Sequence, residues 1–241
     1  MYNELMPINS YQIRICESCG LRYPLMNGHP FGIRCPVCMG ETRVALSRQL
    51  LNEPGPARLF ELNTEIKETP RDLQSSHSLA ANLAVLLDNI RSAWNVGSVL
   101  RSADGFGFSH AYLCGISPTA DNEAVTKTSL GAEDSVPWSY HKDAVKLVKG
   151  LKGEGWKVYA LEDDTRAIAL ESNSLLLNIG DGTPALQVLI VGNEVTGVDP
   201  ELLDMCDEIY YIPMRGEKKL FNVAIAFGIA AYALRMQKLP H

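Results

Sequence analysis

The stretch ALQVLIVGNEVTGVDPE, residues 185–201, decides which fold class the sequence predicts. Val188 to Val191 are consecutive apolar residues, as is typical of a strand that is buried on both faces of a parallel sheet. The apolar run stops at Gly192, and Asp199-Pro200 then provides an N-cap with proline at the first helical position. The residues between them form a strand-to-helix loop, which in open α/β sheets is where ligands bind.

The same alternation of strand and helix extends over residues 79–241. Strand-like segments cover residues 83–90, 110–116, 157–162, 186–192 and 208–214. Helix-like segments cover residues 95–107, 141–155, 200–207 and 222–238. Strands that alternate with helices predict an α/β domain with a mostly parallel sheet.

Length and charge restrict the remaining possibilities. A chain of 241 residues can hold one sizeable domain and a small one. The net charge of -6 excludes a polycation that binds nucleic acid tightly and without specificity. The longest apolar run, residues 223–234, is too short to span a bilayer and predicts a buried helix. No N-terminal segment combines basic residues with an apolar core, so we expect a cytoplasmic protein that enters no membrane.

Two C-x2-C pairs mark residues 1–45 as a separate module. They are Cys16 with Cys19 in CESCG, and Cys35 with Cys38 in CPVCMG. Two disulfides would fit a secreted chain, and a redox C-x-x-C would occur once beside a βαβ unit. Four cysteines at this spacing instead favour a tetrahedral structural zinc in a zinc-ribbon-like module. Such a closed site leaves no position for a substrate and would serve to fold a module too small to bury a core.

The surface of this module and the segment after it allow fewer conclusions. Arginine and aromatic residues are interleaved in the module: Arg14, Arg22, Tyr23, Phe31, Arg34 and Arg43. An RNA-facing surface and an ordinary solvated surface explain this pattern equally well. Residues 46–78 are polar and contain three prolines, which predicts a linker with a short helix near residues 47–52. Cys114 and Cys206 lie on predicted buried elements and are expected to be packing residues.

Three loops of the large domain follow strand-like runs: residues 88–108, 191–197 and 212–226. None contains G-x-G-x-x-G after a strand, and none contains G-x4-G-K-[ST]. A Rossmann dinucleotide site and a P-loop are therefore not supported. Taken alone, each loop is a turn with polar residues.

Taken together, the loops carry an ordered set of motifs. The first is N-x-G-x-x-x-R with a following Phe-Gly, at Asn95, Gly97, Arg101 and residues 106–107. The second is G-N-E-x-x-G at residues 192–197, and the third is I-P-M followed by F-N-V-A-I-A, at residues 212–214 and 221–226. Over residues 79–241 the sequence resembles the SpoU (TrmH-like) branch of the SPOUT RNA methyltransferases.

The resemblance implies a fold, a cofactor and an assembly. In this family the C-terminal part of the α/β sheet is threaded into a trefoil knot, which general rules for connections disfavour. The knotted loops bind S-adenosylmethionine, and the protein works as a homodimer to which the last helix contributes. The residues that match the cofactor site by position are Gly192, Asn193, Gly197, Ile212, Met214, Phe221, Asn222 and Val223. A glycine at position 192 would let the backbone approach the cofactor closely.

The resemblance also implies a reaction, the methylation of a ribose 2′-OH in tRNA or rRNA. Arg101 matches the arginine to which the family assigns activation of the hydroxyl. A guanidinium stays protonated, so we expect Arg101 to hold the neighbouring phosphate and to lower the pKa of the hydroxyl. Asn95 would orient Arg101 or the RNA, and Glu194 would fix the loop or the arginine. Asn222 completes the set of matching catalytic positions.

The sequence departs from the family at Leu220, where many relatives carry a serine in Ser-Leu-Asn. Three alternatives therefore stay open beside a ribose methyltransferase. One is an RNA-binding protein that keeps the knotted fold without the chemistry. The second is a methyltransferase that acts on a base nitrogen, and the third is a zinc-ribbon module fused to a small-ligand sensor.

Overall fold

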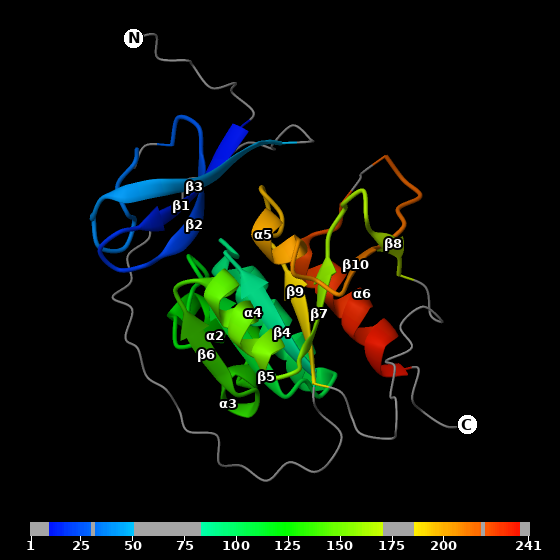
Figure 1. Ribbon diagram of the computed structural model, residues 1–241. Helices are drawn as coiled ribbons and strands as arrows, with labels where there is room; N and C mark the ends of the chain where they lie inside the picture. The colour runs from blue at the N-terminus through cyan, green and yellow to red at the C-terminus, as the bar shows by residue number, and fades with distance from the viewer. Residues whose placement is uncertain (1–9, 30–31, 51–82, 171–185, 218–219, 237–241) are drawn as a thin grey trace. The chain divides into compact units, whose positions relative to one another are not determined.

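The structure is a computed structural model that describes residues 10–29, 32–50, 83–170, 186–217 and 220–236. The chain divides into two compact units, Met1–Lys67 and Glu68–His241 (Figure 1).

The N-terminal unit contains a three-stranded antiparallel sheet with the order β2-β1-β3. Its strands are β1 (Ser10–Cys16), β2 (Arg22–Met26) and β3 (Thr42–Gln49). β3 continues past residue 45 into the predicted linker, because its residues from 46 to 49 pair with the start of β1. The expected short helix near residues 47–52 is therefore wrong for residues 47–49, and residues 51–52 lie outside the described part of the chain.

The C-terminal unit contains a seven-stranded sheet with the order β6-β5-β4-β9-β7-β10-β8, in which every described pair is parallel. The strands are β4 (Leu83–Asp88), β5 (His110–Cys114), β6 (Trp138–His141), β7 (Lys157–Leu161), β8 (Ile168–Ala169), β9 (Gln187–Val191) and β10 (Glu208–Tyr211). The predicted α/β class with a mostly parallel sheet is confirmed. All residues of β4 and β9 are buried, as expected for central strands with both faces covered.

The helices are α1 (Ala93–Gly105), α2 (Glu123–Ser129), α3 (Ala132–Ser135), α4 (Ala144–Gly153), α5 (Pro200–Leu203) and α6 (Val223–Met236). The predicted N-cap at Asp199 is confirmed, since its carboxylate accepts from the N–H of Glu201 and Pro200 opens α5. The segment predicted as a helix from residue 141 starts as strand β6, and the helix begins at Ala144. Elements α2, α3, β6 and β8 were not predicted.

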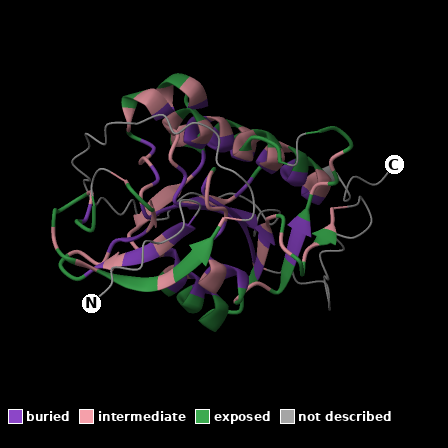
Figure 2. Ribbon diagram, turned by 90° about the horizontal axis from the view of Figure 1, so that it is seen from above, coloured by how far each residue is buried: buried purple, intermediate pink, exposed green. Residues whose placement is uncertain are grey.

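Alternate residues of the central strands build two hydrophobic cores. Val85, Leu87 and Leu189 face the core formed with α1, α2, α3 and α6, whereas Leu86 and Ile190 face the core formed with α4 and α5. Figure 2 shows the buried residues concentrated on the strands and on the inward sides of the helices. The helices therefore cover both faces of the sheet.

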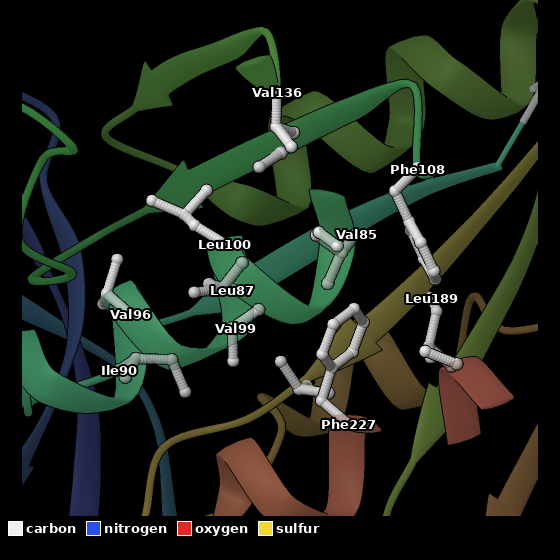
Figure 3. Close-up of a cluster of buried hydrophobic side chains, with 14 of the residues drawn as sticks. Val85, Leu87, Ile90, Val96, Val99, Leu100, Phe108, Val136, Leu189 and Phe227 are labelled. Carbon is white, nitrogen blue, oxygen red and sulfur yellow. The ribbon is translucent and has the colours of Figure 1, made fainter. Parts of the chain in front are cut away.

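Phe227 ties α6 into the first core. Its side chain is fully buried, and its ring lies 5.1 Å from the ring of Phe108, centroid to centroid. Figure 3 shows it reaching into the cluster that also contains Val99 and Leu189. Within the described residues, no helix is long and apolar enough to cross a membrane.

Candidate functional site

The four cysteines of the N-terminal unit converge on one point. The sulfur atoms of Cys16, Cys19, Cys35 and Cys38 all lie within 4.8 Å of one another. Cys16 Sγ lies 3.4 Å from Cys38 Sγ, and Cys19 Sγ lies 3.7 Å from Cys35 Sγ. These distances exceed a disulfide bond of about 2.05 Å. They approach the ~3.8 Å between sulfurs that follows from tetrahedral geometry with zinc–sulfur bonds of about 2.3 Å.

Each cysteine pair lies on a tight turn that contains a left-handed residue. Gly20 (φ 76°) and Met39 (φ 59°) donate their N–H groups to the carbonyls of Cys16 and Cys35, both at 3.0 Å. Glycine thus provides the turn in the first pair, as the sequence predicted, but methionine provides it in the second. Glycine is required at position 40 for a steric reason, because a Cβ there would lie 2.5 Å from the Ser18 hydroxyl of the first turn.

Half of the arginines expected on the surface of this module are buried. Arg14 and Arg22 are 5% and 4% exposed, and Tyr23 is 3% exposed. The guanidinium of Arg14 donates to the Thr42 hydroxyl at 2.7 Å and to the Thr42 carbonyl at 2.8 Å. Arg14 therefore links β1 to β3, and the expectation that these three residues face RNA or solvent is wrong.

Arg34 and Arg43 do lie on the surface of the module. Arg34 faces Glu41, with a nitrogen–oxygen distance of 3.7 Å between two largely exposed side chains. Phe31, the second aromatic residue of the predicted pattern, lies outside the described residues. The exposed basic part of the module is therefore smaller than the sequence pattern indicated.

In the C-terminal unit, the strand order reverses between β4 and β9. From β4 the chain continues outward to β5 and β6, whereas β9 is followed on the other side by β7, β10 and β8. β4 and β9 are adjacent and parallel, so the loops after them leave the same edge of the sheet. Ligands bind at such a switch point in open α/β sheets.

Buried polar residues hold these two loops together. Asp88 ends β4, and its carboxylate accepts from the N–H of Asp199 at 2.8 Å. Asn89 has a left-handed backbone (φ 57°), and its carbonyl accepts from the side-chain amide of Asn193 at 2.7 Å. The Asn193 side-chain oxygen accepts from two further N–H groups in its own loop. The side chain of Asn193 is thus fully engaged in shaping the loop.

Gly192 lies where this loop returns on itself. Asn193 and Gly197 exchange two backbone hydrogen bonds, of 3.1 and 2.9 Å. A Cβ at Gly192 would lie 2.2 Å from the N atom of Val198 and 2.4 Å from the carbonyl carbon of Gly197. The close backbone contact that requires glycine at position 192 is therefore made within the protein, against Gly197 and Val198.

The predicted catalytic residues Glu194, Asn95 and Asn222 form one network. The Glu194 carboxylate accepts from the N–H groups of Arg91 and Ser92, at 2.9 and 3.1 Å. It also accepts from the Asn95 side-chain amide at 2.8 Å. Asn222 then donates to the Asn95 side-chain oxygen at 3.1 Å. Each of the three motif loops thus contributes one side chain to a continuous chain of hydrogen bonds.

The network joins the N-terminal ends of two helices that run side by side. α6 begins directly after Asn222, whose side-chain oxygen caps it by accepting from the N–H of Ala224 at 3.0 Å. At the other end of the pair, Arg235 of α6 donates to the carbonyl of Phe106 at 2.7 Å, just after α1. Both positive helix ends therefore point to the site, and Glu194 lies at one of them.

Arg101 lies on α1 beyond this network. Its side chain is exposed, and within the described ranges it makes no hydrogen bond or ion pair. Neither Asn95 nor Glu194 contacts its guanidinium, so the structure does not bring Arg101 into the network that links the other three residues. The guanidinium therefore remains available to a ligand.

The remaining predicted cofactor positions follow β10 and precede α6. Ile212, Met214 and Val223 are half-buried, while Phe221 is 39% exposed. Leu220, where many relatives carry serine, is 55% exposed. This side of the site thus offers accessible apolar side chains.

Glu162 and Asp88-Asn89 were missed by the sequence analysis. Glu162 follows β7, and its carboxylate accepts from the N–H of Val198 at 2.8 Å. Burial raises the pKa of Glu162, and the two backbone N–H groups that donate to it act in the opposite direction. The available signal was positional, since each of these polar residues directly follows an apolar strand at the same edge of the sheet.

The sequence profile of the SpoU rRNA Methylase family matches residues 82–232, which is more than half of the chain. The chain belongs to the SpoU rRNA methylase family. The matched region includes all three motif loops of the site and does not include the four-cysteine unit.

Curated relatives of this SpoU-family chain include two ribosomal RNA methyltransferases. The 23S rRNA (guanosine-2′-O-)-methyltransferase RlmB of Xanthomonas axonopodis pv. citri is 29% identical over 157 residues, 65% of this chain and 59% of the relative. The 23S rRNA (guanosine(2553)-2′-O)-methyltransferase RlmP of Bacillus subtilis is 31% identical over 155 residues, 64% of this chain and 58% of the relative. The chain thus spans about three-fifths of the length of these relatives.

Solved structures share the SpoU fold. A protein from Porphyromonas gingivalis assigned to the TrmH family of RNA methyltransferases has a TM-score of 0.59 and 28% identity. The match covers 69% of this chain and 64% of that one. The SpoU methyltransferase AviRb of Streptomyces viridochromogenes, in complex with AdoMet, has a TM-score of 0.56 at 20% identity, over 64% and 60% of the chains.

Proposed function

We propose that this chain is an S-adenosylmethionine-dependent RNA methyltransferase that methylates a ribose 2′-OH in rRNA or tRNA. The observation that carries the proposal is the Glu194–Asn95–Asn222 network, with the exposed Arg101 on the same helix as Asn95. The 2′-O-methyltransferase names of its SpoU relatives support the same reaction.

The residues around the site fit the cofactor. Adenosine and a methionine chain need an apolar surface and a few backbone hydrogen-bonding groups. The half-buried Ile212 and Met214, the exposed Phe221 and the backbone of the Gly192–Gly197 loop offer these groups in the segments that follow β9 and β10, the two strands that flank β7. Asn222 and Val223 would complete the pocket, while Asn193 would act by shaping the loop. When bound, the cofactor supplies an electrophilic methyl group on its sulfonium.

Arg101 would position the RNA rather than act as a base. A guanidinium is always protonated, so it can hold a phosphate next to the reacting ribose and stabilise the developing oxyanion. The 2′-oxygen forms a bond to the methyl carbon as the sulfur–carbon bond breaks, and the hydroxyl proton leaves to phosphate or water. Glu194 would contribute by keeping α1 in register with the other loops, since its carboxylate already accepts three hydrogen bonds.

The four cysteines would hold a structural zinc ion. All four sulfurs meet within 4.8 Å, and a soft thiolate set of this geometry suits zinc. A trefoil knot in the sheet and a zinc module followed by a linker remain part of the proposal, with the predicted boundary at residue 45 moved beyond Gln49 because β3 extends to that residue. The position of β9 between β4 and β7, with β10 on the far side of β7, agrees with such a threading.

A homodimer through α6 is the proposed assembly, in the cytoplasm. Ile225, Ile229 and Tyr232 are 55%, 37% and 56% exposed and recur along one face of α6. A second copy would bury this apolar face. Sedimentation velocity should show a dimer for the native chain and a monomer for Ile229→Glu, with Ile168→Glu on the exposed edge strand β8 as the control. A native chain that sediments as a monomer would contradict the dimer.

The reaction is tested with methyl-labelled S-adenosylmethionine and total RNA, followed by digestion to nucleosides. We expect label in a 2′-O-methyl nucleoside and at least a hundredfold slower transfer by Arg101→Ala. Lys127→Ala, on the exposed face of α2, is the control and should transfer at the native rate. Label on a base would overturn ribose methylation.

A non-catalytic RNA-binding protein is the second candidate, and Leu220 is the observation that favours it. An exposed isobutyl group stands where many relatives carry a hydroxyl. This candidate predicts cofactor and RNA binding without transfer of label, and Leu220→Ser would then be the first variant to restore activity.

A further inference from the structure

Trp94 is a large aromatic side chain that the protein leaves in solvent. It is 70% exposed and directly precedes Asn95 on the first full turn of α1. The other two tryptophans, Trp138 and Trp156, are half-buried against their neighbours. An indole carries much apolar area, so Trp94 offers a large contact surface beside the site.

Trp94 and Arg101 share the outward face of α1. With Ser98 they stand at i, i+4 and i+7, so they are aligned along the helix over about 10 Å. The flanking faces are occupied, since Gly97 lies against α2 and Ser102 lies beside Gly228 of α6. The open face therefore presents an aromatic ring and then a cation.

The same end of α1 offers further exposed apolar groups. Leu220 and Phe221 are 55% and 39% exposed and immediately precede Asn222, whose amide donates to Asn95. Apolar side chains thus lie on both sides of the Asn95–Asn222 hydrogen bond. The N-terminal ends of α1 and α6 add partial positive charge at the same place.

We infer that Trp94 stacks on an unpaired base next to the nucleotide that is methylated, while Arg101 holds a phosphate of the same strand. The inference rests on the proposed function and names its substrate as single-stranded or looped RNA. Stacking on aromatic rings beside a basic group is how proteins hold unpaired nucleotides. A second copy of the chain fits the uncharged stripe of α6 better than this mixed aromatic and cationic face.

Tryptophan fluorescence tests the inference on the full-length protein. We expect a short oligoadenylate to quench the native emission, whereas an RNA duplex of the same length should quench little. Trp94→Phe should remove the quenching, and Trp94→Ala should weaken oligoadenylate binding about tenfold. Trp156→Phe is the matched control, because it removes an indole distant in sequence from the motifs and should keep the quenching.

Arg101→Ala separates the two contacts. Arg101→Ala should weaken oligoadenylate binding and reduce the slope of log affinity against log salt concentration by about one. The quenching of Trp94 fluorescence at saturating oligoadenylate should be unchanged. Quenching that is unchanged in Trp94→Phe would overturn the inference. So would a Trp94→Ala protein that binds oligoadenylate normally but sediments as a monomer, because Trp94 would then be a contact between copies.

The inference and the proposed function can fail separately. Methyl transfer to ribose by the native chain, with an unchanged KM for RNA in Trp94→Ala, would overturn the stacking role alone. Quenching that depends on Trp94 without any methyl transfer would overturn the catalytic proposal alone.

Discussion

At the scale of single residues, the Glu194 carboxylate connects the loop after β9 to the start of α1. It accepts from two backbone N–H groups and from Asn95, in the position where a helix end favours negative charge. The sequence analysis predicted that Glu194 fixes the loop or Arg101. It could not identify the actual partners, because Arg91 and Ser92 are about a hundred positions away in the chain.

Replacing Glu194 by alanine leaves three donors without their acceptor. We expect Glu194→Ala to lower the free energy of unfolding by about 1–2 kcal/mol, as for the loss of a helix cap. Urea denaturation measures the change. Glu123→Ala, which removes an exposed carboxylate paired with Lys127, is the control and should lower the stability far less, because exposed ion pairs contribute little. Equal stability losses in both variants would contradict the role given to Glu194.

At the scale of elements, α1 was predicted well and its packing was not. The helix predicted over residues 95–107 differs from α1 by two residues at each end, because the signals that end a helix are local. The requirement for Gly97 is not local. A Cβ there would lie 2.5 Å from the carbonyl oxygen of Val125 on α2, a helix that the sequence analysis did not predict.

Two glycines of α1 give a matched comparison. Gly97→Ala should lower the free energy of unfolding by about 1–3 kcal/mol, because α2 must move. Gly105→Ala meets nothing within 4 Å and should raise it by about 0.5 kcal/mol, since alanine favours a helix. The urea midpoints of the two variants measure these changes. A Gly97→Ala variant that is more stable than the native protein would show that α1 and α2 can move apart without cost.

Two histidines, His110 on β5 and His141 on the edge strand β6, should make stability depend on pH. His110 and His141 share the Ser139 hydroxyl at 2.9 Å each, and burial, with the neighbouring His141, lowers the pKa of His110 to about 4. The unfolded chain binds a proton near pH 6.5, so stability present above that pH is lost as pH falls towards 4. The loss should be on the order of 2 kcal/mol, and His110→Gln should reduce the pH dependence of the urea midpoint. An unchanged dependence would contradict this assignment.

At the scale of the whole molecule, the sequence predicted the separation into two units and the class of each. The parallel sheet followed from the alternation of apolar runs, and the four-cysteine cluster followed from spacing. The buried state of Arg14 and Arg22 could not be predicted, because it depends on the antiparallel pairing of β1 with β2 and β3. The reversal of strand order that creates the site likewise depends on contacts between distant segments.

Metal removal should act on one unit only. We expect one zinc per chain by elemental analysis, and a strong chelator or Cys35→Ser should unfold the N-terminal unit, as is usual for small zinc modules. The C-terminal unit, which has two hydrophobic cores of its own, should keep its cooperative unfolding transition. Cys114→Ala, at a buried cysteine outside the cluster, is the control and should keep the zinc. A metal-free native chain would contradict the proposed site.

The hydrogen bond between Asn95 and Asn222 spans 127 positions of the chain. The ribosome therefore completes all seven described strands of the C-terminal sheet, and helices α1 to α5, before it supplies the last partner of the network. A chain that ends before Asn222 contains every described strand of the sheet, yet it cannot form the hydrogen-bond network at the start of α1. The proposed activity should therefore require that α6 docks against α1 and closes this contact.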